Sequence, residues 1–224
     1  MRLLRRKART FEIQVQDMTL HIQAATDVDE ESRAAALSFW EVLHAYSIRD
    51  PSFRDSKRPV KVSEDAPEIV REMAATAGRA GVGPKYSFQG AVTDHVGRLL
   101  AREVNEVTVN CGGDYFIRSR KRQKLTVVRR PGSPVAIVVP ATREGVGISM
   151  ASGNGRVGAI DGMAVLAESC MLAGAAAAGV QAILSKKDGL QTALAYLKKV
   201  PGVIGGVVFL GERIGMAGGL ELAA

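Results

Sequence analysis

The sequence predicts an α+β fold in a single domain, residues 1–224, with antiparallel or mixed sheets packed against helices. Apolar residues recur at helical spacing in some segments and at every second position in others, and the two kinds of segment are intermixed. Short turns join the period-two segments, as in antiparallel hairpins, whereas parallel βαβ units need long crossovers. One core suffices, because a chain of this size buries about 70% of its surface.

A basic N-terminal extension, residues 1–10, precedes the first predicted element. It could open a secretory signal, but apolar and polar residues alternate in Phe11–Val15 and again in Met18–Ile22, which predicts a β-hairpin. The other candidate for a membrane segment, Ser169–Val180, is short and rich in alanine and glycine, so it cannot span a bilayer. We therefore expect a cytoplasmic protein without a membrane partner.

Three helices are predicted in the first half of the chain. The first, Val28–Ile48, has an apolar stripe that includes the only Trp, and Asp50-Pro51 ends it. In the second, Asp65 can act as the N-cap. Gly81–Pro84 interrupts the chain before the third helix, in which apolar residues recur at helical spacing over Phe88–Leu100.

The second half begins with strands. Four short strands are predicted within Val107–Val139, because the apolar period changes to two and turn residues separate the segments. A glycine-rich loop is expected over Gly145–Gly162. An alanine-rich helix that ends at Leu184 and a further helix, Asp188–Lys199, follow.

A closing hairpin is predicted from Val203–Leu210 and Gly215–Leu222. Its apolar residues, Val207–Leu210, could pair across subunits, so a homo-oligomer is an open possibility.

The first candidate site is the turn Asn110–Asp114, which contains Gly112 and Gly113. Adjacent glycines leave backbone N–H groups approachable and permit the positive φ of a phosphate-binding nest. Asp114 could then contact a ribose, a purine or a metal ion. The alternative is that the glycine pair only makes a tight hairpin turn, which is ordinary turn chemistry.

The second candidate site is the glycine-rich loop, in which Ser152, Gly153, Asn154 and Arg156 combine a hydroxyl, a cation and free amides suited to phosphate oxygens. The loop contains a literal G-x-G-x-x-G. We reject the dinucleotide fingerprint, because no strand–loop–helix unit surrounds it and Asp161 follows directly. A surface loop without a ligand is the equal alternative.

The third candidate site is a basic run over residues 118–130 that could bind nucleic acid or a protein. Few aromatic residues lie near it, so a solvated hairpin tip is favoured and a nucleic-acid partner is not expected. Cys111 could be a nucleophile, but a small buried cysteine is the commoner case. Asp94 and His95 could form an acid/base pair or simply pack in the core.

Taken in order, these motifs resemble the ApbE-like superfamily, and specifically its shorter cytoplasmic branch. The resemblance covers nearly the whole chain, and its motifs are Asp65–Val70, Gly81–Pro84, Gly90, Val96-Gly97, Glu106–Asp114, Ala151–Gly153 and Val200–Gly205.

The resemblance implies the ApbE-like α+β fold and a magnesium-dependent flavin transferase, which takes FMN from FAD and attaches it to a Thr or Ser of a protein acceptor. Gly112, Gly113 and Asp114 match the Gly-Gly-Asp motif near the nucleotide, while Ser152 and Gly153 match the Thr-Ser-Gly turn.

The chain also departs from that superfamily. The Asp and Thr that bind the metal correspond to Gly174 and Ala178, Gln89 replaces a lysine, and a segment with a histidine is missing. Phosphoryl chemistry depends on such charges, so these departures argue against transfer.

The leading hypothesis from the sequence is a protein that binds FAD, FMN or a related phosphate-bearing ligand where the two glycine-rich turns converge on an electropositive hollow. The enzyme alternative is an FMN transferase with a rearranged magnesium site built from Asp114 and Asp161. A third alternative is an interaction module that uses the basic run.

Overall fold

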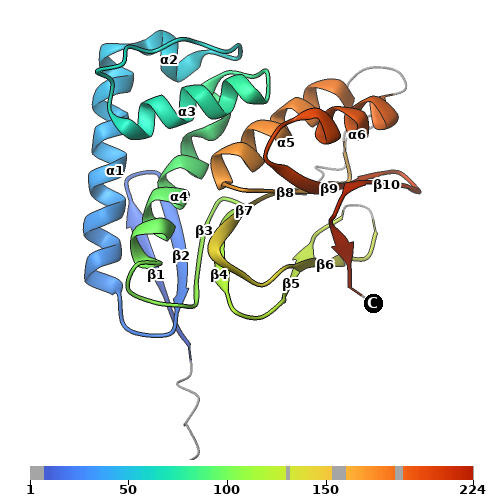
Figure 1. Cartoon of the computed structure of the whole chain (residues 1–224), viewed down its shortest axis with the longest axis horizontal. Helices are drawn as coiled ribbons and strands as arrows, with labels where there is room; N and C mark the ends of the chain where they lie inside the picture. The colour runs from blue at the N-terminus through green and yellow to red at the C-terminus, as the bar shows by residue number, and fades with distance from the viewer. Residues whose placement is uncertain (1–7, 130–131, 153–159, 185–188, 224) are drawn as a thin grey trace, which may run out of the picture.

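The computed structural model describes residues 8–129, 132–152, 160–184 and 189–223. Its main element is an eight-stranded antiparallel sheet in the order β1-β2-β3-β4-β7-β8-β9-β10 (Figure 1). The strand bounds are β1 Arg9–Val15, β2 Met18–Ala24, β3 Val107–Cys111, β4 Asp114–Ser119, β7 Thr142–Ser152, β8 Gly162–Ala167, β9 Val203–Leu210 and β10 Arg213–Gly218. A smaller antiparallel sheet has the order β11-β6-β5. Its strands are β5 Gln123–Val127, β6 Val135–Val139 and β11 Glu221–Leu222.

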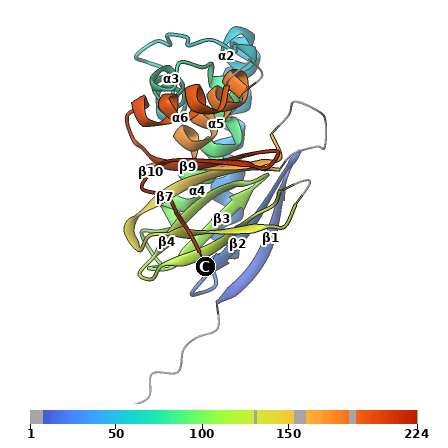
Figure 2. The ribbon, with the colours of Figure 1, turned by 90° about the vertical axis from the view of Figure 1, so that its right-hand side faces the viewer.

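The helices lie together on one side of the strands (Figure 2). Their bounds are α1 Asp29–Arg49, α2 Pro51–Asp55, α3 Glu68–Arg79, α4 Phe88–Leu100, α5 Cys170–Leu184 and α6 Gly189–Lys199, and a 3-10 turn, η1, spans Pro84–Ser87. α4 packs on β3 and β4, α5 on β7 and β8, and α6 on β9 and β10. The predicted α+β fold with antiparallel sheets is therefore confirmed.

The strand β8 shows how three layers form. All six of its residues are buried. Met163 and Val165 belong to the apolar cluster under α5 and α6, whereas Ala164 and Leu166 belong to the cluster that includes β5 and β6. Because alternate side chains of a strand point to opposite faces, helices cover one face here and the small sheet covers the other.

The ends of the first helices differ from the sequence prediction in two places. Asp50 ends α1, but its carboxylate also accepts the Phe53 N–H at 3.1 Å and so caps the short helix α2, in which Pro51 occupies the first position. In α3 the N-cap is Pro67, and no side chain caps the helix. The prediction that Asp65 is the cap is wrong, because the helix begins one residue after Pro67.

The predicted loop over Gly145–Gly162 is wrong for its first part, since β7 continues to Ser152. Two glycines hide the strand in the sequence. A Cβ at Gly145 would lie 2.4 Å from the Phe116 ring, and one at Gly147 would lie 1.9 Å from the backbone of Ser169. Glycine in a strand often marks such a close approach, so these residues let β4 and the start of α5 pack directly against β7.

The apolar end of the closing hairpin lies inside the molecule. Val207, Val208 and Phe209 are fully buried between β8 and β10. They provide no surface for pairing between subunits, so a homo-oligomer stays an untested prediction without that support. In the part of the chain that the structure describes, every helix is too short or too polar to cross a membrane.

Candidate functional site

Several connections meet at one end of the large sheet. Register places Leu20 of β2 opposite Cys111 of β3, so the β1–β2 and β3–β4 turns are neighbours. The Met150 N–H of β7 donates to the Gly113 carbonyl oxygen at 2.9 Å, beside the point where β7 ends at Ser152. Residues far apart in the sequence therefore surround one region, on the side that α4 and α5 cover.

The Gly112–Gly113 pair makes a two-residue hairpin turn between Cys111 and Asp114. Its φ angles, 59° and 98°, are both positive, as in a type I′ turn. The Gly113 N–H donates to Asn110 Oδ1 at 3.3 Å, so this amide is already engaged and does not serve a phosphate. A Cβ at Gly113 would lie 2.7 Å from the Met150 carbonyl oxygen, so the turn also needs glycine to approach β7.

A cavity of about 310 Å³ adjoins this turn, and we call it the α5 cavity. Its walls come from η1 and the start of α4, from Gly112 and Asp114, from the end of β7, and from a face of α5 that carries Gly174, Ala177 and Ala178. A Cβ at Gly174 would lie 3.6 Å from Asp114 Oδ2 and 3.0 Å from the Tyr86 carbonyl oxygen. The small residues of α5 thus leave open the space that Asp114 faces.

Asp114 is the carboxyl group of this cavity. It is buried and stands opposite Ser149 in the β4–β7 pair. Burial raises the pKa of Asp114 to about 7, the nearby charge of Asp94 acts in the same direction, and a hydrogen bond with Ser149 opposes them. At neutral pH Asp114 therefore exchanges a proton readily and can either donate a hydrogen bond to a ligand or accept one.

Asp94, which raises the Asp114 pKa, has a structural partner of its own. Its carboxylate oxygens accept the N–H groups of Cys170 and Met171 at 2.7 and 2.9 Å. These are the first two residues of α5, where unpaired amides and the helix dipole favour a negative group. Asp94 thereby fixes the start of α5 relative to α4, and so the wall of the cavity. Burial nevertheless raises the pKa of Asp94.

Lys85 is the cation of the α5 cavity, and sequence reasoning missed it. The family resemblance directed attention to Gln89. Its side-chain amide packs closely on Gly112, since a Cβ at Gly112 would lie 2.9 Å from Gln89 Oε1. Lys85 precedes Gln89 by four residues, and its side chain also lines the cavity. The sequence did offer one signal for Lys85, because this residue directly follows Gly83-Pro84, where a helical segment begins. Among the described residues, Lys85 and Asp114 are the charged residues of the wall, so this part of the hollow is of mixed charge.

Asp161, the second carboxylate proposed for magnesium, lies elsewhere. Its carboxylate accepts the Gly211 N–H in the β9–β10 turn and does not line the α5 cavity. Among the described residues, His, Cys, Asp and Glu side chains form no group of three or more that could hold a metal ion. Magnesium binds through one or two carboxylates and keeps demanding octahedral geometry. Among the described residues Asp114 is the single carboxyl of the cavity, and burial favours its protonated form, which is a poor metal ligand, so we derive no step through a metal.

The other loop residues proposed from the sequence are only partly placed. Ser152 is exposed and follows Ala151, which lines the cavity, but Ser152 itself does not. Gly153, Asn154 and Arg156 lie outside the described residues.

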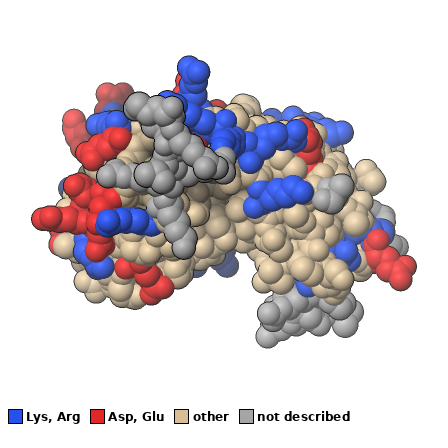
Figure 3. Space-filling view, turned by 90° about the horizontal axis from the view of Figure 1, so that it is seen from below, with Lys and Arg blue, Asp and Glu red and all other residues tan. Residues whose placement is uncertain are grey.

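The basic run over residues 118–130 does not act as one free surface. Seen from below, Lys and Arg spread over the middle and right of the molecule, whereas most Asp and Glu gather at the left (Figure 3). Arg122 pairs with Glu221, and Arg129 lies over the Phe209 ring at 4.9 Å. Part of the run is therefore engaged within the chain.

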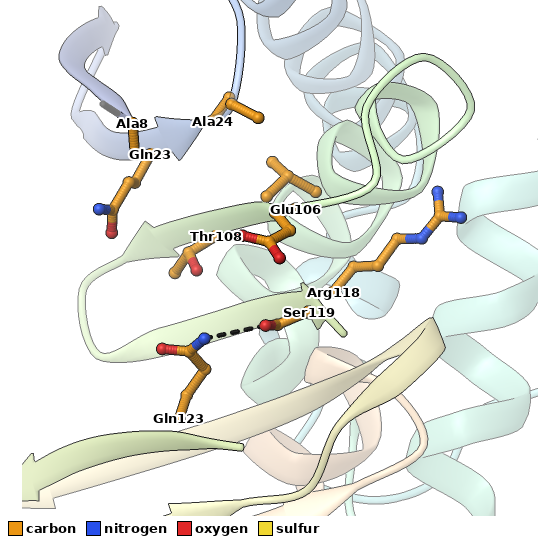
Figure 4. A pocket seen from close by; sticks show the side chains of 10 residues that line it. Ala8, Gln23, Ala24, Glu106, Thr108, Arg118, Ser119 and Gln123 are labelled. Carbon is orange, nitrogen blue, oxygen red and sulfur yellow. Dashed lines mark hydrogen bonds between the residues drawn. The ribbon is translucent and has the colours of Figure 1, made fainter. Parts of the chain in front are cut away.

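Arg118 borders a small polar cavity of about 120 Å³ at the opposite end of β2, β3 and β4. Its guanidinium donates to the Val104 carbonyl oxygen at 3.2 Å and runs away from the amides of Gln23 and Gln123 (Figure 4). Gln123 instead donates to Ser119 Oγ at 2.8 Å. This cavity is small, and two of its polar side chains are bonded to each other.

The remaining single candidates have structural partners. Cys111 and Cys170 are buried, and burial raises the pKa of Cys111 to about 11 and that of Cys170 well above its usual value. Neither thiol is activated as a nucleophile. Asp94 faces α5, whereas His95 Nε2 lies 3.2 Å from Glu72 Oε2, so Asp94 and His95 have different partners and do not form an acid/base pair.

Comparison with known sequences gives a family. A model of the family described as AbpE bacteria matches residues 1–207. A UPF0280 protein of Methanopyrus kandleri is 30% identical over 218 residues, which cover 92% of this chain and 88% of that protein. A UPF0280 protein of Methanosarcina barkeri is 27% identical over 217 residues, which cover 90% of this chain and 80% of that protein.

Comparison with solved structures gives the fold. The ApbE protein of Thermotoga maritima matches with a TM-score of 0.64 at 12% identity, covering 94% of this chain and 97% of that one. A flavinyl transferase ApbE of Pseudomonas stutzeri matches with a TM-score of 0.61 at 15% identity, covering 97% and 96%. At these identities the likeness concerns the arrangement of the elements and not the activity.

Proposed function

The chain belongs to the AbpE bacteria family, within the ApbE-like superfamily, and from this premise we propose that it binds a flavin nucleotide or a related phosphate-bearing ligand in the α5 cavity. The observation that carries the proposal is the meeting of Lys85 and Asp114 across a wall of small residues on α5. A cation, a carboxyl that holds a proton near pH 7, and open space form a suitable receptor for a phosphate and its attached sugar.

Lys85 supplies the electrostatic part of this receptor. Among the residues that the structure describes, it takes part in no ion pair. Its charge helps the Arg54 hydrogen bond to lower the pKa of Asp55, and its exposed side chain stays accessible to a ligand. Protonated Asp114 adds a hydrogen-bond donor and, being neutral, does not repel an anion.

Binding without magnesium-dependent transfer is the function that the described residues favour. In the described part of the chain the α5 cavity has one carboxyl group, and Gly174 and Ala178 stand where the resemblance places metal ligands. Transfer of FMN to a protein acceptor needs charge stabilisation that Lys85 and Asp114 do not complete. FAD and FMN thus enter the proposal as bound ligands, and an acceptor protein is a partner only of the enzyme alternative.

Titration calorimetry with FMN and FAD tests the proposal. We expect binding to the wild type, at least tenfold weaker binding to Lys85→Met, and partial retention in Lys85→Arg. Lys198→Met is the matched control, because it removes the same charge from an exposed position on α6 that lines none of the described cavities. Equal affinity in Lys85→Met and Lys198→Met would overturn the proposal. Covalent flavin on an added acceptor, seen as a mass shift, would favour the transferase instead.

A further inference from the structure

A separate cavity lies beside the second half of α4, and we call it the α3 cavity. It measures about 540 Å³, and its walls come from α3, α4, β4, the start of β7 and the connection from β8 to α5. None of its described lining residues also lines the α5 cavity. A volume of this size accommodates a small organic molecule, so the α3 cavity can serve a ligand other than the one proposed above.

A buried hydroxyl without a partner lies in the wall of the α3 cavity. Thr76 of α3 is 5% exposed and lines this cavity. In the part of the chain that the structure describes, its hydroxyl makes no hydrogen bond. Thr93 of α4, by contrast, donates to the Gln89 carbonyl oxygen at 2.8 Å, which is the usual arrangement for a threonine within a helix. Because buried hydroxyls are nearly always bonded, the Thr76 hydroxyl at a cavity wall points to a ligand that supplies the missing bond.

The two guanidinium groups of the α3 cavity already have partners. Arg98 contacts Glu72 at two points, Nη1 to Oε1 at 3.3 Å and Nη2 to Oε2 at 2.6 Å. Arg79 donates from Nη1 to Glu168 Oε1 at 2.6 Å. A guanidinium whose charge is balanced by a carboxylate attracts a further anion only weakly. These pairs therefore disfavour an anionic ligand in this cavity.

Carboxyl groups outnumber guanidinium groups in the α3 cavity. Asp94 and Glu144 line it together with Glu72 and Glu168, so among the described residues four carboxyl groups accompany two guanidinium groups. The Asp94 oxygens are occupied by the amides at the start of α5. Glu144 is exposed and takes part in no ion pair within the described ranges. The excess charge is therefore negative, and Glu144 is the carboxylate that a cationic ligand can reach.

The donor set decides which kind of cation fits. In the described part of the chain, His, Cys, Asp and Glu form no group of three or more that could hold a metal ion. An ammonium group has three hydrogen-bond donors and no acceptor, so it complements a hydroxyl oxygen and a carboxylate. Ala75, Phe116 and Met171 also line the cavity and can cover an alkyl chain attached to the ammonium group.

We propose that the α3 cavity binds a small alkyl amine in its protonated form, with the Thr76 hydroxyl and the Glu144 carboxylate as acceptors for the ammonium group. The ion pairs Arg98–Glu72 and Arg79–Glu168 shape the walls and exclude small anions. This proposal does not depend on the proposed function, because the two cavities share no described residue.

The test is titration calorimetry with four probes at matched ionic strength, since exposed charges are screened by salt. We expect 1-aminobutane or 1,4-diaminobutane to bind the wild type. 1-Butanol, which has the same alkyl chain without the charge, and inorganic phosphate should not bind in this cavity. Absence of binding by both amines would overturn the proposal, and so would phosphate binding that is lost in Arg79→Met.

Two variants locate the ammonium group. Glu144→Gln should weaken amine binding about fivefold or more, the usual effect of losing one charged hydrogen-bond partner. Glu212→Gln is the matched control, because it removes the same charge from an exposed turn residue that lines none of the described cavities. Thr76→Val keeps the shape of the side chain, so it should keep or raise the melting temperature and yet bind the amine several-fold more weakly.

Equal amine affinity in Glu144→Gln, Thr76→Val and Glu212→Gln would overturn the assignment of the site. FMN titrated into the same variants gives the second readout. Its binding should be the same as in the wild type, because Glu144 and Thr76 do not line the α5 cavity. Loss of FMN binding by the wild type would overturn the proposed function and leave the amine site standing, so the two failures are distinguishable.

Discussion

The replacement Asp114→Asn tests whether the cavity carboxyl is held in its neutral form. Asparagine keeps the shape of the side chain and can still accept the Ser149 hydrogen bond, but it carries no titrating group. The pKa of Asp114 is raised from 3.8 to about 7 in the folded chain. Between these two pH values the folded chain binds more protons than the unfolded chain, so the stabilisation present below pH 3.8 is lost as the pH rises through 7.

The size of this pH effect on the free energy of unfolding follows from the difference in protons bound by the folded and unfolded chains. Over the roughly two pH units between 5 and 7, a difference of nearly one proton costs about 1.4 kcal/mol per unit, or about 3 kcal/mol in all. Urea unfolding at pH 5 and pH 8 measures it. The wild type should lose about 3 kcal/mol more than Asp114→Asn between the two conditions. Titrating groups that do not touch Asp114 contribute alike to both proteins, so the difference reports Asp114 together with its coupling to Asp94.

Parallel pH profiles of the two proteins would refute this reasoning. They would mean that water reaches the carboxyl freely, or that the Ser149 hydrogen bond stabilises the ionised form as well as bulk water does. The same experiment with FMN present adds a second readout. A ligand that carries phosphate should bind best below pH 7, where Asp114 is neutral.

The remaining predictions concern packing and the missing metal ligand. Asp94→Asn should lower the free energy of unfolding by about 2 kcal/mol in urea denaturation, because one amide at the start of α5 loses its charged acceptor. Gly147→Ala should destabilise the chain by about 3 kcal/mol or more, whereas Gly78→Ala, at an exposed position of α3 with open space around it, should raise the melting temperature. Gly174→Asp should place a second carboxylate beside Asp114 and create magnesium binding, seen by calorimetry in the variant and not in the wild type.

Most elements of the fold could be predicted because their signals are local. The alternation in Phe11–Val15 and Met18–Ile22 gives β1 and β2, and the apolar stripe of Val28–Ile48 gives α1. The strand β7 escaped prediction, since Gly145 and Gly147 look like loop residues until their neighbours are known. The ApbE-like resemblance read from the motifs is confirmed by the family match and by the solved structures.

The candidate site was predicted in part. Gly112 and Asp114 do lie with Gly174 in one cavity, but Asp161 lies outside it, and Lys85 was not foreseen as a cavity residue. Spacing within a segment cannot reveal which side chains from different helices face the same space.

The sequence by itself determined the α+β class, the order of most elements, the turn at Gly112–Gly113 and the family, because each depends on short-range patterns of polarity and backbone freedom. Only the tertiary structure decided the rest. Packing of β7 and α5 around Asp114 removes its carboxyl from water and changes its proton affinity, and the junction of η1 with α4 brings Lys85 to the wall of the same cavity. Both effects arise from contacts between distant segments, and it is these contacts that set burial, charge and the space left for a ligand.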